Sequence, residues 1–334
     1  MGDHYNADRW TDEQLARVEA RLHRIYSAAA VETTARAEAF YSRLAERDAV
    51  MRKRLESGEI TKDAYETWLR RQMLTGKINE DMRDELAGQI TDTNVLAAQL
   101  ITESRPEIFA YNHNYAAYGL ETVYGDLAFT LYDAETVRRL IVESTDLLPE
   151  MSEALAVNIP VDIRWNKEKI VDVITSGILQ GKSIPDIAGG LETVVGMNET
   201  SAVRNARTAI TGAQNAGRQE SYNHAASMGI AVRKRWVATK DSRTRDSHRA
   251  MDGVEVPYNE EFHTDLGSVM MYPGDRNGKP ADVYNCRCTM KTVEKAGIEA
   301  EPRQMRVRDP ATGKNVVVKE MTYTEWERWV KSRG

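Results

Sequence analysis

Apolar residues recur every three or four positions along the first part of the chain. The first run begins with Leu15, Val18, Leu22 and Ile25 and continues into an alanine-rich stretch. This spacing places the apolar residues on one face of a helix. We therefore predict one long amphipathic helix that begins after an N-cap at Thr11 and reaches about residue 56.

Glycine, threonine and proline mark the ends of the helices that follow. Gly58 ends the first helix, and Thr61 is a suitable N-cap for a second. A third helix is expected over about residues 79–104. Pro106 is expected to close it, because the residue before a proline disfavours helical geometry. The apolar stripes are narrow and the other faces are charged, so we predict extended helical hairpins.

The middle of the chain contains a tyrosine stripe and a helix boundary. Tyr111, Tyr115 and Tyr118 share one helical face, which favours a core stripe, although tyrosine is also enriched at docking surfaces. Asp133 is expected to cap a helix that reaches Glu143. The proline-containing segment 148–162 is interpreted as a linker near a domain boundary.

Helical periodicity continues to about residue 227. One helix is expected over 166–180, and Ser183 is expected to cap a short helix. Asn198 is expected to open the next helix, which has small residues along one side and so allows another element to approach closely. These small residues are Ala202, Ala206, Ala209, Ala213 and either Ala216 or Gly217.

After Gly229 the pattern changes to short strands separated by turns. Strands are predicted over 232–239 and 283–293, with turns at Asp252-Gly253 and Pro273-Gly274. A hairpin over 305–318, turning at Thr312-Gly313, and a helix over 324–331 follow. The predicted fold is α+β: a long N-terminal helical arm, then a compact C-terminal domain with a small mixed β-sheet packed on helices. The predicted segments are 1–160, 161–300 and 301–334.

Composition excludes several classes of protein. The 334 residues contain no run of eighteen apolar residues, so a membrane span is not expected. The N-terminal sequence MGDHYNADRW lacks the basic and apolar regions of a secretory signal. Two cysteines do not form a disulfide framework, so we expect reduced thiols. The net charge of -6 argues against a protein that coats nucleic acid over its whole surface.

A basic cluster stands out between residues 233 and 249. This segment contains seven lysines and arginines but only two acidic residues, Asp241 and Asp246, which leaves an excess of five positive charges. Such a cluster is suited to the phosphates of double-stranded DNA. The alternative is a network of arginines paired with carboxylates of the fold itself or of a neighbouring subunit. The candidate phosphate contacts are Arg233, Lys234, Arg235, Arg243, Arg245 and Arg249.

The two cysteines form the second candidate site. Cys286 and Cys288 are two positions apart on a predicted strand, so both side chains are expected on one face. With His248 or His263 they supply three zinc ligands, and Asp241 or Asp246 is a candidate fourth. Buried structural thiols beside a hydrogen-bonded histidine are the alternative to a zinc site.

Enzymatic interpretations of the same residues are incomplete. A thiol activated by His248 is a competent nucleophile, but no feature of the sequence supplies an oxyanion hole. A nuclease site at Asp241, Asp246 and His248 lacks the further carboxylates of a two-metal centre. The sequence therefore presents no complete catalytic constellation.

Residues 178–293 resemble the Mu F-like, or SPP1 gp7-type, minor head proteins of tailed bacteriophages. The resemblance rests on a strand with a tryptophan, an Asp-x-Arg-Thr-Arg-x-x-His run, a Pro-Gly turn and a closing Asn-Cys-Arg-Cys, in that order. The matching residues are Trp236, Asp241, Arg243, Thr244, Arg245, His248, Pro273, Gly274, Asn285, Cys286, Arg287 and Cys288.

The resemblance implies a structural protein that acts in head assembly and in the handling or ejection of packaged DNA. It implies a portal protein as partner, docked by residues 1–160, with major capsid or scaffold protein and double-stranded DNA as further partners. The implied location is the virion, in the capsid interior or at the portal vertex, and the host cytoplasm during assembly. The alternative is a metal- or Cys/His-dependent nuclease, hydrolase or transferase centred on His248, Cys286 and Cys288.

Overall fold

The computed structural model describes residues 4–125, 127–148, 156–293, 304–308, 315–319 and 321–332. Two compact units make up the chain. Unit 1 comprises Met1–Val18, Ile101–Ala154 and Arg204–Gly334, and unit 2 comprises Glu19–Leu100 and Leu155–Val203. Each unit is built from segments far apart in the sequence. The predicted segments 1–160, 161–300 and 301–334 are continuous stretches of sequence, so these units do not test them. They stay a prediction, which limited proteolysis would test.

Unit 2 is helical. It contains parts of α1 (His4–Glu56), α3 (Lys77–Tyr124) and α7 (Glu192–Ser227), together with α2 (Lys62–Leu74), α5 (Ile159–Leu179) and α6 (Ile184–Gly190). A chain of asparagines enters its core, in which the half-buried Asn94 donates to Asn198 and the buried Asn198 donates to the buried Asn166. These two hydrogen bonds join α3 to α7 and α7 to α5. They therefore hold the three helices in one register. Around it pack apolar side chains that include Leu22, Leu69, Met73, Leu86, Ile90, Ile170, Ile174 and Ile178.

Most of the predicted helix starts are confirmed. Thr61, Asp133 and Ser183 are the N-caps of α2, α4 (Ala134–Glu143) and α6, and Ser183 forms a capping box with Asp186. Each cap oxygen accepts a hydrogen bond from a backbone N–H that has no partner inside its helix. Local hydrogen bonding therefore fixes these boundaries.

Four predicted boundaries are wrong, one of them because α5 begins at Ile159, ahead of the predicted residue 166 and inside the segment 148–162 interpreted as a linker. Helix α1 begins at His4, and Thr11 lies buried within it, where its hydroxyl accepts a hydrogen bond from Asn112. Helix α3 continues through Pro106 to Tyr124, although an internal proline costs about 3 kcal/mol. Buried residues on both sides of the proline, such as Ile101 and Ile108, offset that cost. Helix α7 starts at Glu192, ahead of the predicted Asn198.

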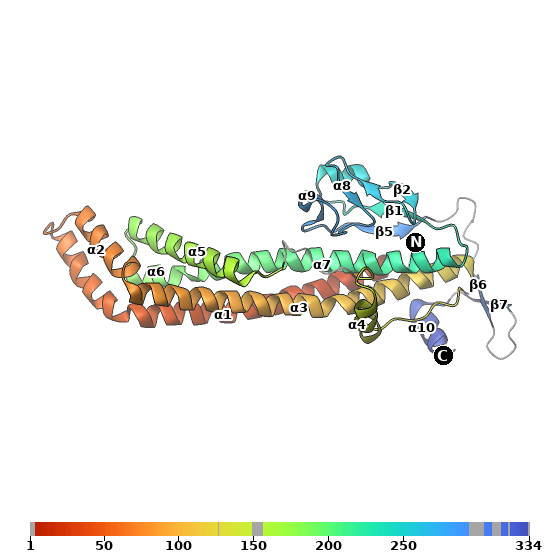
Figure 1. The fold of residues 1–334 in the computed structure, drawn as a ribbon, viewed down its shortest axis with the longest axis horizontal. Helices are drawn as coiled ribbons and strands as arrows, with labels where there is room; N and C mark the ends of the chain where they lie inside the picture. Colours follow the sequence, from red (N-terminus) through yellow and green to blue (C-terminus); the bar gives the residue numbers. More distant parts are fainter. Residues whose placement is uncertain are drawn as a thin grey trace. The chain divides into compact units, whose positions relative to one another are not determined.

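A small sheet forms the β part of unit 1. The central strand β1 (Arg233–Val237) pairs with β2 (Glu255–Pro257) on one side and with β5 (Thr289–Thr292) on the other. Both pairings are antiparallel, so the sheet is antiparallel where a mixed sheet was predicted. A second hairpin joins β3 (Phe262–His263) to β4 (Val269–Met270), and α8 (Asp246–Met251) and α9 (Pro280–Val283) lie beside the strands (Figure 1). The α+β fold class is confirmed.

The C-terminal elements are those expected. Strands β6 (Gln304–Arg308) and β7 (Asn315–Lys319) pair as an antiparallel hairpin, whose predicted Thr312-Gly313 turn lies outside the described residues. Helix α10 (Tyr323–Lys331) packs its aromatic residues on α3, where Tyr118 lies against Tyr323 and Trp326. Tyr115 and Tyr118 are buried, so the tyrosine stripe belongs to the core. No helix in the described part of the chain is long and apolar enough to span a membrane.

Candidate functional site

Two hydrogen bonds connect helix α7 to the first two residues of the Asn-Cys-Arg-Cys motif. The Asn285 backbone N–H donates to Thr208 at 2.8 Å, and the Thr211 hydroxyl donates to the Cys286 carbonyl at 2.8 Å. Asn285 has a φ of 57°, a left-handed geometry that asparagine tolerates better than most residues. These contacts turn the chain so that it presents both cysteines to the core.

Asn215, on the same helix, connects two parts of the motif. Its amide nitrogen donates to the carbonyls of Pro273 and Cys288, at 3.0 and 3.1 Å, and its oxygen accepts from the backbone N–H of Met290. The Pro-Gly turn thereby lies close to α7, where a Cβ on Gly212 would stand 3.1 Å from the Gly274 oxygen. Gly212 on α7 therefore allows the turn to approach, and it lies outside the stripe of small residues that was predicted.

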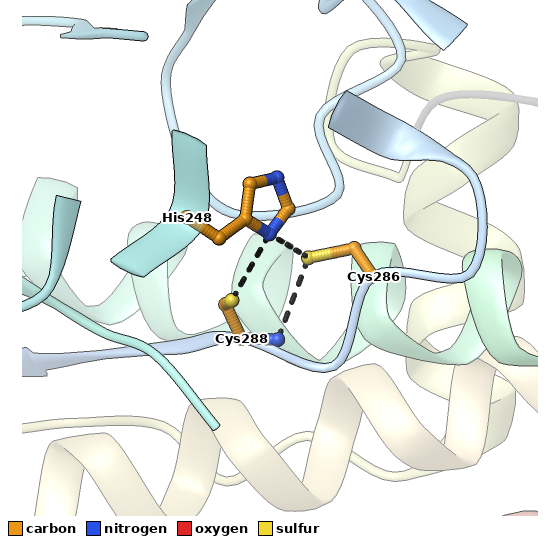
Figure 2. Close-up of side chains that lie close together, drawn as sticks. All are labelled: His248, Cys286 and Cys288. Carbon is orange, nitrogen blue, oxygen red and sulfur yellow. Dashed lines mark hydrogen bonds between the residues drawn. The ribbon is translucent and has the colours of Figure 1, made fainter. Parts of the chain in front are cut away.

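His248, Cys286 and Cys288 meet in the interior (Figure 2). The Nδ1 atom of His248, from α8, lies 3.3 Å from the Cys288 sulfur and 3.7 Å from the Cys286 sulfur. All three residues are 2% exposed or less. The cysteines lie between α9 and β5 rather than on a strand, so the strand prediction was wrong for them. Their sulfurs nevertheless face the same histidine nitrogen.

Asp282 supports this cluster from the other side of the imidazole ring. Its Oδ1 atom lies 3.5 Å from Nε2 of His248, and the side chain is fully buried. Hydroxyls of Ser247, Thr264 and Ser268 donate to its carboxylate at 2.9, 2.6 and 2.6 Å. Burial raises the pKa of this carboxyl, but the three donors outweigh it and hold the pKa below its usual value. Asp282 is therefore held as an anion.

The two thiols are electrostatically unequal. The thiol of Cys286 donates toward Cys288, which lowers the pKa of Cys288, while the same contact and complete burial raise the pKa of Cys286. Cys288 also gains from its contact with His248. The contact between the two sulfurs and the contact with His248 thus favour the thiolate form at Cys288, and thiolates suit binding of a soft cation.

The acidic candidates for a fourth ligand lie elsewhere. Asp241 binds Arg287 through both carboxylate oxygens, at 2.5 and 2.8 Å, and accepts from the backbone N–H of Arg243. The Arg287 guanidinium lowers the pKa of Asp241. Asp246 and His263 are exposed. The structure therefore selects His248 over His263 and uses Asp241 to tie the motif together.

The predicted basic cluster is divided between the interior and the surface. Lys234 is buried, and its Nζ donates to Gln219 and to the Met271 carbonyl, so it cannot reach a phosphate in this conformation. Arg245 donates to the carbonyls of Tyr284 and Asp282. The remaining candidates are exposed at the surface: Arg233, Arg235, Arg243 and Arg249.

Several supporting residues were missed by sequence reasoning. Asp282 follows a proline in a four-residue helix and carries no recognisable motif. Arg218 is buried on α7, donates to Asn112 and to the Met290 carbonyl, and pairs with Asp8 at 2.6 Å. Asn215 and Arg218 share one face of the helix with Thr208 and Thr211, and this polar stripe was the available signal for them.

The comparisons with known proteins agree with the resemblance. The family described as Phage Mu protein F like protein matches residues 168–291. Minor head protein GP7 of Bacillus phage SPP1 is 26% identical over 332 residues, 97% of this chain and 96% of that protein. No solved structure matches significantly.

Two further relatives match shorter stretches. An NAD(+)--arginine ADP-ribosyltransferase, EFV, of Enterococcus faecalis is 34% identical over 142 residues, 41% of this chain and 28% of that protein. The uncharacterized protein YqbB of Bacillus subtilis is 30% identical over 129 residues, 38% of this chain and 41% of that protein.

Proposed function

We propose that this chain is a minor head protein acting in head morphogenesis of a tailed bacteriophage, because its residues 168–291 match the Phage Mu protein F like family and nearly its whole length is similar to a minor head protein. The observation that carries the proposal is the match to Minor head protein GP7 over 97% of this chain. That match extends far beyond the family region and so includes the helical part.

We further propose that the protein acts at the portal vertex. The portal protein is the partner that the resemblance implies, with residues 1–160 as the docking region. Long helices with limited core of their own gain stability by packing against another protein, which supports that assignment. Major capsid or scaffold protein and packaged DNA are the further proposed partners, with the protein in the capsid interior or at the portal vertex.

Genetic deletion and co-purification test this function. In a phage that encodes the chain, removal of its gene is expected to reduce infectious particles, and the full chain supplied in trans is expected to restore them. The full chain is also expected to co-purify with the portal protein of the same phage. A normal particle yield after deletion would refute the role in head morphogenesis, and failure to co-purify would refute the portal assignment alone.

The exposed arginines support a contact with packaged DNA. The Arg243 and Arg249 side chains are 73% and 54% exposed, although they also lie 3.8 and 3.2 Å from carboxylate oxygens of Asp241 and Asp246. Two phosphate contacts contribute about 2 to the slope of log affinity against log salt. Replacing both with Gln is expected to lower duplex affinity and to reduce that slope, whereas Arg17→Gln with Arg21→Gln, at exposed positions on α1, is the control. Equal effects of both pairs, or none, would refute a specific contact.

The enzymatic alternative has weaker support. His248, Cys286 and Cys288 are buried, so a substrate cannot reach the candidate nucleophile in this conformation. The similarity to the ADP-ribosyltransferase covers 28% of that protein, so most of that enzyme has no aligned counterpart here. We therefore propose a stabilising role for the cluster.

A further inference from the structure

The His248, Cys286 and Cys288 cluster has the dimensions of a metal site. All of the ligand atoms lie within 4.8 Å of one another. A tetrahedral zinc site with bonds of 2.0–2.3 Å separates its ligand atoms by about 3.5–3.8 Å. The Nδ1 atom lies 3.3 and 3.7 Å from the two sulfurs. An ion therefore fits with small side-chain adjustments and without rebuilding the backbone.

The surroundings of His248 select the nitrogen that would bind. Histidine ligands in metal sites commonly donate their other ring N–H to a carboxylate, which fixes the tautomer and the ring orientation. Asp282 occupies that position, 3.5 Å from Nε2, and three hydroxyl donors fix its own orientation. Nε2 is buried and lacks a hydrogen bond within ordinary limits. A hydrogen bond from Nε2 to Asp282 requires only a small shortening of this 3.5 Å distance. Such a bond places the proton on Nε2 and leaves the Nδ1 lone pair facing the two sulfurs.

We propose that His248 Nδ1 and the Cys286 and Cys288 sulfurs bind one zinc ion, with Asp282 as the positioning residue. Two thiolates and one imidazole favour zinc over calcium or magnesium, which prefer oxygen ligands. No fourth His, Cys, Asp or Glu side chain among the described residues completes the group. Three protein ligands are typical of catalytic zinc, but burial of all three here points to a structural ion.

The site would connect two parts of the chain. His248 belongs to α8, the cysteines precede β5, and β5 pairs with the central strand β1. A bound ion would therefore fix the last strand of the sheet against the segment that follows the first. The proposal is independent of the proposed role in phage heads, because it concerns how this part of the chain is held together.

Metal analysis of the purified full-length chain tests the proposal. We expect about one zinc ion per chain. After chelation, cobalt(II) is expected to give the sulfur-to-metal charge-transfer absorption of a thiolate complex. Cys286→Ser and Cys288→Ser are each expected to lose the ion, whereas the exposed His263→Ala, as the matched control, should retain it. A metal-free wild type that takes up neither ion, or equal loss in the His263 variant, would overturn the proposal.

Asp282→Asn separates positioning from coordination. It should weaken zinc affinity about 10–100-fold while keeping the cobalt absorption, because both sulfurs and Nδ1 remain. If a variant fails to fold, the wild type alone remains decisive, since a bound ligand raises the melting temperature as its concentration rises. Chelated wild-type protein whose melting temperature is unchanged by added zinc would overturn the proposal.

Discussion

Replacing Asn215 with Ala is expected to loosen the closing segment of the motif. The Asn215 side chain is fully buried, and outside its own helix it satisfies two carbonyls, those of Pro273 and Cys288, and the N–H of Met290. Each buried polar group left without a partner costs about 1–3 kcal/mol. The three groups together give a loss of at least about 3 kcal/mol. Because 1.4 kcal/mol is a factor of ten, the local opening equilibrium should rise about 100-fold.

Hydrogen exchange followed by mass spectrometry measures this effect where it occurs. A peptide covering residues 285–292 should exchange about 100-fold faster in the Asn215→Ala variant, provided that opening limits exchange in both proteins. Asn223→Ala is the matched control, because Asn223 is exposed on the same helix and its amide bonds only to side chains of that helix. Unchanged protection in Asn215→Ala, or equal loss in Asn223→Ala, would refute the reasoning.

Two further predictions concern packing and pH. Gly217→Ala should destabilise the chain by about 1–3 kcal/mol in urea unfolding, because the new Cβ would stand 2.3 Å from the Phe109 carbonyl oxygen. Gly196→Ala is the control. It should be neutral or stabilising, because a Cβ at that position would have no neighbouring atom within 4 Å. Equal effects would contradict the close approach. Burial lowers the pKa of Lys234 from 10.5 to about 7, against the opposing effect of nearby carboxylates. The folded state therefore binds fewer protons than the unfolded state between these values, so stability should rise with pH across this range. Lys234→Met should reduce that rise, and an identical pH dependence in both proteins would contradict the shift.

Local signals predicted the helices better than the boundaries set by tertiary contacts. The N-caps at Thr61, Asp133 and Ser183 are fixed by hydrogen bonds within four residues, which a sequence reveals directly. Pro106 failed as a boundary because burial on both sides of it outweighs a local penalty. That balance depends on which distant residues pack against the helix.

The same distinction applies to the site. The spacing of Cys286 and Cys288 correctly indicated that their side chains lie on one side of the chain, where both sulfurs face His248, but the choice between His248 and His263 depended on how α8 packs. Asp282 could not be predicted, because its role comes from hydroxyl groups on two other segments, α8 and the turn between β3 and β4. Lys234 looked like its exposed neighbours in a basic run, yet alternation along β1 buries it.

Quantitative mass spectrometry of purified virions tests the central claim most directly. In particles of a phage that encodes this chain, the account predicts that the protein is present in a few copies per head and remains with DNA-filled heads through density-gradient purification. Its absence from such particles, while it accumulates in the infected cell, would contradict the assignment as a minor head protein.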